Sequence, residues 1–140
     1  KGGDMNKITM VMGGHVDFAA VTIPSTASYV QSGELRALAV TSPVRSPFLP
    51  DVPTAKELGI DMAFTQDTGF YMPPNTPEDI VMSFSKAIKA ISEDKDYITE
   101  INKMFFSPRY MDSKEFTEHL NKEYQYWTKL AEMGGIKSTK

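Results

Sequence analysis

The sequence contains no cysteine among its 140 residues. Disulfides and thiolate metal sites are therefore excluded, and the redox compartment stays undecided. The only two histidines, His15 and His119, lie far apart in the chain, which is a poor start for a catalytic triad or a metal site. A nucleophile elbow and a phosphate-binding loop are also missing. These absences argue against an enzyme, so we expect no catalytic residue, no cofactor and no metal ion.

The chain also lacks a long apolar run and an excess of positive charge. No stretch approaches the roughly 18 apolar residues of a membrane span, so we expect no direct membrane insertion. The formal net charge is −3 and no basic stripe is present, which disfavours nucleic acid as a partner. The chain begins Lys-Gly-Gly without a visible signal peptide. We interpret it as a processed chain, an expression product or a fragment.

A pattern of short apolar runs is present over positions 13–59. Runs at 16–22 and 35–41 flank about a dozen residues of helical character. The second run is apolar on both alternating faces, as in a strand that helices cover on both sides. A strand, a helix and a strand make a βαβ unit, which predicts an α/β fold with a parallel sheet.

A proline-rich segment follows at positions 43–53. Its four prolines recur every three or four residues, which excludes a helix or a central strand. We expect an ordered traverse along the surface. Thr54-Ala55-Lys56-Glu57 then matches a capping box and predicts a short helix.

The rest of the chain predicts mainly helices, apart from a strand-like segment at 63–72. Asp4 can cap a helix over 5–12, which the glycines at 13 and 14 end. Apolar residues recur at three-and-four spacing over 80–91, over 97–105 and along a last helix that opens at Asp112. The aromatic stripe of this last helix is interpreted as core or lobe packing rather than as a cofactor site.

Three sequence blocks together resemble one known family. They are GGHVD at 13–17, GELRALAVTS at 33–42 and LPDVPT at 49–54, the last followed by Glu57 and Gly59. In this order, and with PPNTP at 73–77, they resemble the periplasmic solute-binding receptors of tripartite tricarboxylate transporters, the Bug or TctC family. One block alone would be a weak signal, whereas three in the right order are specific.

The resemblance implies a fold. Members are two-lobed, clamshell-like (type II-like) periplasmic binding proteins with parallel-rich sheets flanked by helices, and they run to roughly twice this length. The chain would therefore be a C-terminal half. Residues 1–62 would form the second half of lobe two, 63–72 the crossing between the lobes, and 73–140 the C-terminal part of lobe one.

The resemblance also implies a function. Such a receptor captures a small carboxylate by hinge closure in the bacterial periplasm and delivers it to the membrane subunits of its transporter. Its signal peptide would precede Lys1. The alternative is a fragment without binding activity that has a structural or interaction role, and exposed edges of its apolar strands would make it self-associate. The amino-acid sequence does not identify which carboxylate such a receptor binds.

The first candidate ligand-binding residues lie at the start of the chain. Gly2 and Gly3 form a glycine turn before a helix start, whose free N–H groups can hold a carboxylate. The alternative is a simple strand-to-helix turn, but the resemblance implies backbone contacts from this turn to the ligand. Asp4 joins the candidates, although its carboxylate competes with an anionic ligand for the same helix dipole.

Two further candidates carry hydroxyl groups. Thr22 follows a predicted strand, at the end where open α/β sheets collect ligands; the alternative role is helix capping. Thr68 lies in the predicted crossing between the lobes. Its neighbour Asp67 would disfavour a carboxylate there unless the ligand also carries a cation. His15 and Asp17 are interpreted as structural residues.

Overall fold

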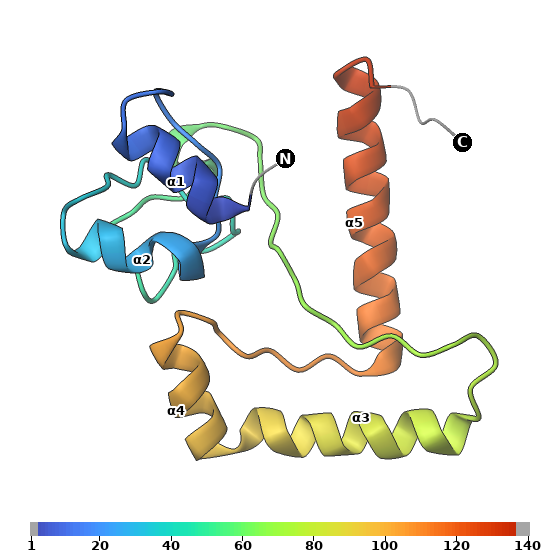
Figure 1. Ribbon diagram of the computed structural model, residues 1–140. Coiled ribbons are helices and arrows are strands. Elements are labelled where there is room, and N and C mark those ends of the chain that lie inside the picture. Colours follow the sequence, from blue (N-terminus) through green and yellow to red (C-terminus); the bar gives the residue numbers. More distant parts are fainter. Residues whose placement is uncertain (1–2, 137–140) are drawn as a thin grey trace. The chain divides into compact units, whose positions relative to one another are not determined.

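The structure is a computed structural model that describes residues 3–136. In this range the chain forms α1 (Asp4–Met12), α2 (Ile23–Gln31), the short 3-10 helix η1 (Lys56–Leu58), α3 (Glu78–Glu93), α4 (Lys95–Lys103) and α5 (Ser113–Met133) (Figure 1). Contacts divide the chain into two units. The first comprises Lys1–Gly69 and Ile98–Ser107, and the second comprises Phe70–Tyr97 and Pro108–Lys140.

The first unit has a small apolar core between α2 and the segment that follows it. The core consists of the buried residues Val40, Leu49 and Val52, against which Ile23, Val30 and Ala37 pack. In α1 the buried residue is Ile8, and in α2 Thr26 and Ala27 are buried. The start of α2 is thus anchored to the core through Ile23, and α1 contacts α2 (Figure 1).

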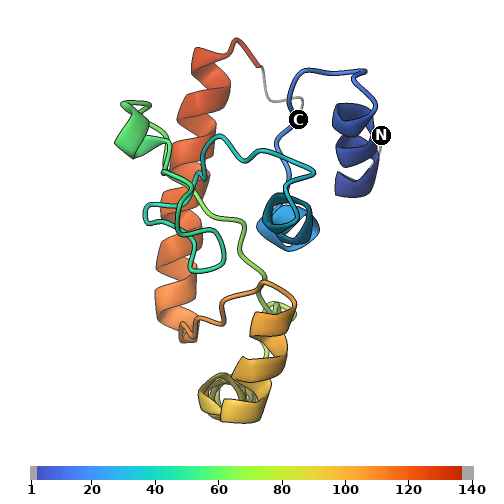
Figure 2. The ribbon, with the colours of Figure 1, turned by 90° about the vertical axis from the view of Figure 1, so that its left-hand side faces the viewer.

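The predicted parallel sheet is not formed by the described residues. Positions 16–22, 35–41 and 63–72 contain no regular strand, and Figure 2 shows no strand arrow. Val40 and Thr54 form one isolated parallel bridge. In it the Val40 N–H donates to the Pro53 carbonyl at 2.9 Å, and the Ala55 N–H donates to the Val40 carbonyl at 2.8 Å.

The sheet part of the α/β prediction is therefore wrong for residues 3–136, and the reason is physical. A strand requires a second segment that accepts and donates hydrogen bonds along its length. Within residues 3–136 that arrangement stops after one bridge. Apolar alternation shows that a segment can be covered on its faces, but it does not show that a neighbouring strand is available.

The proline-rich traverse and the short helix after it are confirmed. The Thr54 N–H donates to Glu57 Oε2 at 2.6 Å, and the Glu57 N–H donates to Thr54 Oγ1 at 3.1 Å. These are the reciprocal bonds of a capping box. Arg45 Nε lies 3.0 Å from both carboxylate oxygens of Glu57. Arg45 therefore ties the traverse to η1, and this bond holds the pKa of Glu57 below its usual range.

The second unit contains α3 and α5, both predicted from their periodicity. A capping box opens α5: Asp112 Oδ1 accepts the Lys114 and Glu115 N–H groups at 2.9 and 2.8 Å, and Glu115 Oε2 accepts the Asp112 N–H at 3.1 Å. Gly134 ends the helix, as predicted. The helix predicted over 97–105 starts two residues earlier, as α4, because Asp94 accepts the Tyr97 N–H at 2.8 Å and caps it.

The helices of the C-terminal half bury little apolar surface. None of the described residues of α3, α4 or α5 is buried. On the aromatic stripe of α5, Trp127 is 44% exposed and Tyr124 75%, so the stripe is not a core in the described part of the chain. Within residues 3–136, every helix is too short or too polar to cross a membrane.

Candidate functional site

The start of α1 has no side-chain cap among residues 3–136. Gly3 occupies the N-cap position with φ −64° and ψ −177°, and no side chain caps the helix there. Asp4, expected as the cap, is already the first helical residue. A Cβ on Gly3 would meet no atom within 4 Å, so neither the backbone nor packing requires glycine. Of the first-turn N–H groups, that of Asn6 donates to the Gly3 carbonyl at 3.1 Å, and no described side chain caps the others.

The Asp4 carboxylate turns to the start of α2. Its Oδ2 accepts the Thr22 N–H at 2.9 Å, the Thr22 hydroxyl at 2.8 Å and the Ser25 hydroxyl at 3.3 Å. Thr22 is the N-cap residue of α2, and Ser25 lies in its first turn. A residue of one helix therefore bonds the N-cap residue and a first-turn hydroxyl of the other, near a helix start whose dipole favours a negative charge. These three residues are called the Asp4 cluster below.

Lys7 balances the charge of the Asp4 cluster. Its Nζ lies 3.1 Å from Asp4 Oδ1 and 3.1 Å from the Ala20 carbonyl oxygen. The Lys7 side chain is 46% exposed, and an ion pair at such a position contributes about 0–1 kcal/mol. The amide and hydroxyl bonds to Oδ2 therefore account for most of the stabilisation of the carboxylate.

Hydrogen bonding lowers the pKa of Asp4 to about 2. The Thr22 N–H lowers the pKa most, and the Thr22 hydroxyl comes next. Partial desolvation of the carboxyl group raises the pKa, and Lys7 lowers it by a smaller amount. Asp4 is therefore ionised at neutral pH. An ionised carboxylate only accepts hydrogen bonds, so the Thr22 N–H and the Thr22 hydroxyl direct their protons toward Asp4.

The structure brings together three of the predicted site residues, Gly3, Asp4 and Thr22. Gly2 lies outside the described residues. Thr68 is exposed in an irregular segment and forms no hydrogen bond to the described residues of the Asp4 cluster. Two neighbours were missed, Lys7 and Ser25. Lys7 stands three residues after Asp4, a spacing at which helical side chains meet, so this contact could have been predicted.

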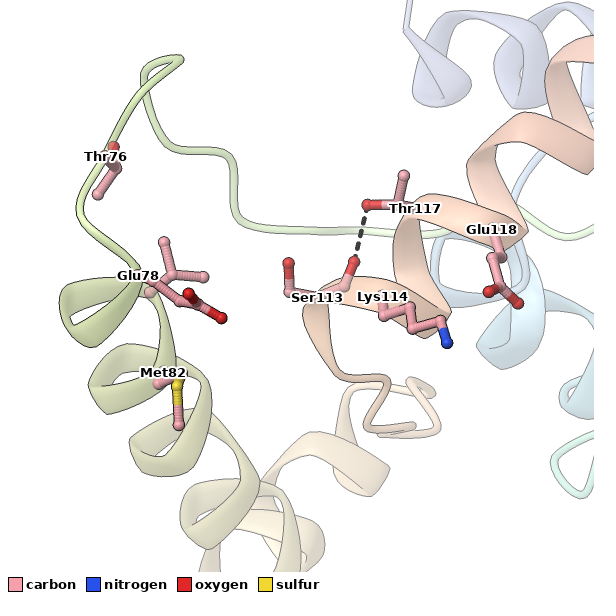
Figure 3. Close-up of a pocket in the computed structure, with 8 residues that line it drawn as sticks. Thr76, Glu78, Met82, Ser113, Lys114, Thr117 and Glu118 are labelled. Atoms are coloured by element: carbon pink, nitrogen blue, oxygen red, sulfur yellow. Dashed lines mark hydrogen bonds between the residues drawn. The ribbon is translucent and has the colours of Figure 1, made fainter.

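A separate pocket of about 490 Å³ lies in the second unit, beside the starts of α3 and α5 (Figure 3). Most of its lining residues are polar or charged, with Glu78 and Met82 from α3 and Lys114 and Glu118 from α5. The Thr117 hydroxyl donates to the Ser113 carbonyl at 2.7 Å in its wall. None of the predicted ligand-binding residues lines this pocket. Among the described residues, no cluster of acidic or histidine side chains could hold a metal ion.

Comparison with known proteins decides the family. The profile of TctC, the tripartite tricarboxylate transporter family receptor, matches residues 1–136. The chain belongs to the TctC family. This confirms the resemblance that the three sequence blocks indicated.

Two curated relatives are similar to this TctC family chain. The "UPF0065 protein in gbd 5'region" of Cupriavidus necator is 34% identical over 116 residues, which cover 83% of this chain and 35% of the relative. The "UPF0065 protein in the TAR-I ttuE-ttuC' intergenic region" of Agrobacterium vitis is 33% identical over 88 residues, covering 62% of this chain and 25% of the relative. Neither name states a function.

A solved structure shows the same fold. It is R. palustris Rpa4515 with adipate, which superimposes with a TM-score of 0.73 at 23% sequence identity. The match covers 95% of this chain and 45% of that protein. The TctC family chain therefore has the fold of part of R. palustris Rpa4515, although its described residues lack regular strands. It spans less than half the length of the proteins it matches.

Proposed function

We propose that the full-length protein is a periplasmic solute-binding receptor. It captures a small carboxylate and delivers it to the membrane subunits of a tripartite tricarboxylate-type transporter. The observation that carries this proposal is the TctC match across residues 1–136. The fold shared with R. palustris Rpa4515, solved with adipate, supports a carboxylate ligand. The protein works by binding and release, without a catalytic step or a cofactor.

The open start of α1 supports a mode of carboxylate binding. Backbone N–H groups at a helix start and the positive end of its dipole favour an anion. Lys7 adds a cation whose ammonium group has three donors, of which two are used by Asp4 and Ala20. We assign Gly2, Gly3, Asp4, Thr22 and Thr68 to the ligand-binding surface of the full-length receptor.

The proposal assigns each segment of the chain to one part of a two-lobed receptor. Residues 1–62 belong to one lobe, residues 63–72 cross between lobes, and residues 73–140 belong to the other. Ligand binding then closes the lobes by a hinge motion, and the transporter recognises the closed form. The Asp4 cluster lies in the first of these segments, so it supplies one wall of the cleft.

A thermal-shift screen of the full-length protein tests this function. Small mono-, di- and tricarboxylates, adipate among them, are added in excess, together with uncharged amides of the same carbon length. A carboxylate that binds the folded state raises the melting temperature as its concentration rises. We expect such a shift for at least one carboxylate and for none of the amides. A screen in which no carboxylate shifts the transition contradicts the proposal.

One observation favours a second function, that of an interaction fragment without binding activity. Apolar side chains of α3 and α5 remain partly exposed in the described structure, with Ile80 51% exposed and Met82 63% on α3 and Tyr124 75% on α5. Such side chains recruit other chains. The two functions are separated by the ligand screen on the full-length protein together with the oligomeric state of the shorter chain, because an interaction fragment assembles and shows no carboxylate shift.

A further inference from the structure

The end of α4 carries a bulky residue in a conformation that favours glycine. Phe105 has a φ of 61°, in the left-handed region that costs a residue with a Cβ more than it costs glycine. The Phe105 N–H donates to the Asn102 carbonyl at 3.0 Å, and the Phe106 N–H donates to the Ile101 carbonyl at 3.2 Å. These are the two bonds of a Schellman motif, whose left-handed position is usually glycine.

Three other helices of the chain end with the residue that this position favours. Two positions past the last residue of α1, α2 and α5, the chain has glycine in the left-handed conformation, with φ of 68°, 80° and 69° for Gly14, Gly33 and Gly135. Phe105 stands at the same place relative to the end of α4. A strained residue persists only where its surroundings hold it, so the side chain of Phe105 requires a partner.

That partner is Phe48 of the proline-rich traverse. The centroids of the Phe48 and Phe105 rings lie 5.7 Å apart with their planes at 89°, the favourable edge-to-face arrangement of two aromatic rings. Phe48 is itself held in place. Its carbonyl accepts the Gln31 side-chain amide of α2 at 3.3 Å, and the next residue, Leu49, is buried in the core. The ring contact therefore fastens the end of α4 to the core of the first unit.

The segment around Phe105 belongs to the first unit, although the chain on both sides of it does not. Ile98–Ser107 groups with Lys1–Gly69, whereas Phe70–Tyr97 and Pro108–Lys140 make up the second unit. If the ring of Phe105 left Phe48, the backbone could return to a negative φ and relieve its strain. The two bonds of the Schellman motif would then break, because they require the left-handed residue.

We propose that Ile98–Ser107 is a releasable strap, which the contact between Phe48 and Phe105 fastens to the first unit. The docked state has the ring contact and a strained backbone, and the released state has neither. Because the two contributions oppose each other, the strap opens more readily than the core on which it docks. Its release frees the chain on both sides without unfolding the first unit. The inference goes beyond the proposed function and holds whichever ligand the protein binds.

Amide hydrogen exchange of the full-length protein measures how readily the strap opens. The reporters are the N–H groups of Phe105 and Phe106, and the reference is the Ala55 N–H, which donates to the Val40 carbonyl of the core at 2.8 Å. In wild type we expect the strap amides to be at least about tenfold less protected than Ala55. Phe48→Ala should lower their protection by a further factor of about ten, as loss of an edge-to-face pair does, and leave Ala55 nearly unchanged.

Two variants of Phe105 separate the ring contact from the backbone strain. Phe105→Gly and Phe105→Ala both remove the ring, but glycine alone adopts the left-handed conformation at little cost. We expect the Phe106 N–H to be at least about fivefold better protected in Phe105→Gly than in Phe105→Ala. When Phe48→Ala is added to Phe105→Gly, it should change this protection by less than about threefold, because no ring contact is left to lose.

Phe84→Ala is the matched control. It removes one ring of another edge-on pair, with Phe70 at 5.4 Å and 76° in the second unit, and should leave the strap amides unchanged. Strap amides that are as protected as Ala55, or that do not respond to Phe48→Ala, overturn the releasable strap. Equal protection of the Phe106 N–H in Phe105→Gly and Phe105→Ala also overturns it. If Phe48→Ala does not fold, this comparison of the two Phe105 variants decides by itself.

Discussion

The Thr22 N–H donates to Asp4 Oδ2 over 2.9 Å, although 18 positions separate the two residues in the chain. This bond joins the first residue of α1 to the N-cap residue of α2. The two helix starts are consequently unlike. An internal anion bonds the N-cap residue at the start of α2, whereas no side chain of the described residues caps the start of α1.

Removing the Asp4 carboxylate should destabilise the protein. In Asp4→Ala the Thr22 N–H and the hydroxyls of Thr22 and Ser25, at the start of α2, lose their acceptor. We expect the free energy of unfolding to fall by about 1–3 kcal/mol, the usual range for a lost cap or an unsatisfied part-buried donor. Urea denaturation followed by circular dichroism measures the change. The control Asp17→Ala should lie within about 0.5 kcal/mol of wild type, and an equal effect of both variants would contradict the capping role.

Stability should also fall at low pH through Asp4. Its pKa is about 2 in the folded state, against an ordinary value of 3.8. The folded state therefore binds this proton less readily than the unfolded state, and stability is gained as the pH rises. The contribution is complete above about pH 4 and is lost as the pH falls through about 2.

Comparison with Asp4→Asn isolates this effect, because the pKa of Glu57 is also lowered by Arg45 and Glu57 titrates in both proteins. The difference in unfolding free energy between wild type and Asp4→Asn should shrink as the pH falls from 4 toward 2. Denaturation curves at half-unit pH intervals measure it. A constant difference across this range would show that Asp4 has no special proton affinity in the folded protein.

Ligand binding should depend on Gly3 more than on Arg45. A leucine at Gly3 meets no atom of the described chain with its Cβ, and a φ of −64° suits any residue, so Gly3→Leu affects mainly a ligand at the start of α1. Arg45 instead holds Glu57 and the Pro50 carbonyl. We expect Gly3→Leu to weaken carboxylate binding at least about tenfold, as loss of a hydrogen-bonded anion contact does, and Arg45→Ala to leave it nearly unchanged. Calorimetry giving the reverse order would exclude backbone binding of the anion.

Local signals in the sequence predicted much of the fold. The capping boxes at Thr54 and Asp112 and the glycine ends of α1 and α5 are all observed, because each depends on residues within one turn of chain. The strands at 16–22 and 35–41 were not, because a strand depends on a neighbour that no local pattern reveals. The bond between Asp4 and Thr22 could not be predicted for the same reason. Each residue was a candidate by itself, but their contact depends on how α1 meets α2.

The last prediction concerns the 140-residue chain by itself. It spans 45% of the solved structure that it resembles, so the rest of that fold supplies surfaces that this chain does not. Large apolar side chains of the isolated chain are exposed to solvent: Phe84 is 39% exposed, Ile91 47% and Phe70 67%. Strand pairing in residues 3–136 is limited to a single bridge. Exposed apolar faces and unpaired extended segments recruit other chains.

We therefore expect the isolated chain to self-associate and to bind carboxylates weakly or not at all. Self-association follows from the exposed apolar side chains of α3 and α5, and weak binding follows because a cleft with one wall cannot enclose its ligand. Light scattering over a range of concentrations measures the first effect, and calorimetry with the carboxylate that binds the full-length protein measures the second. The full-length protein, monomeric and binding in the same buffer, is the control. An isolated chain that stays monomeric and binds this carboxylate at micromolar affinity or better would contradict this prediction. Residues 1–140 would then contain a complete binding site and need no further segment to cover their apolar side chains.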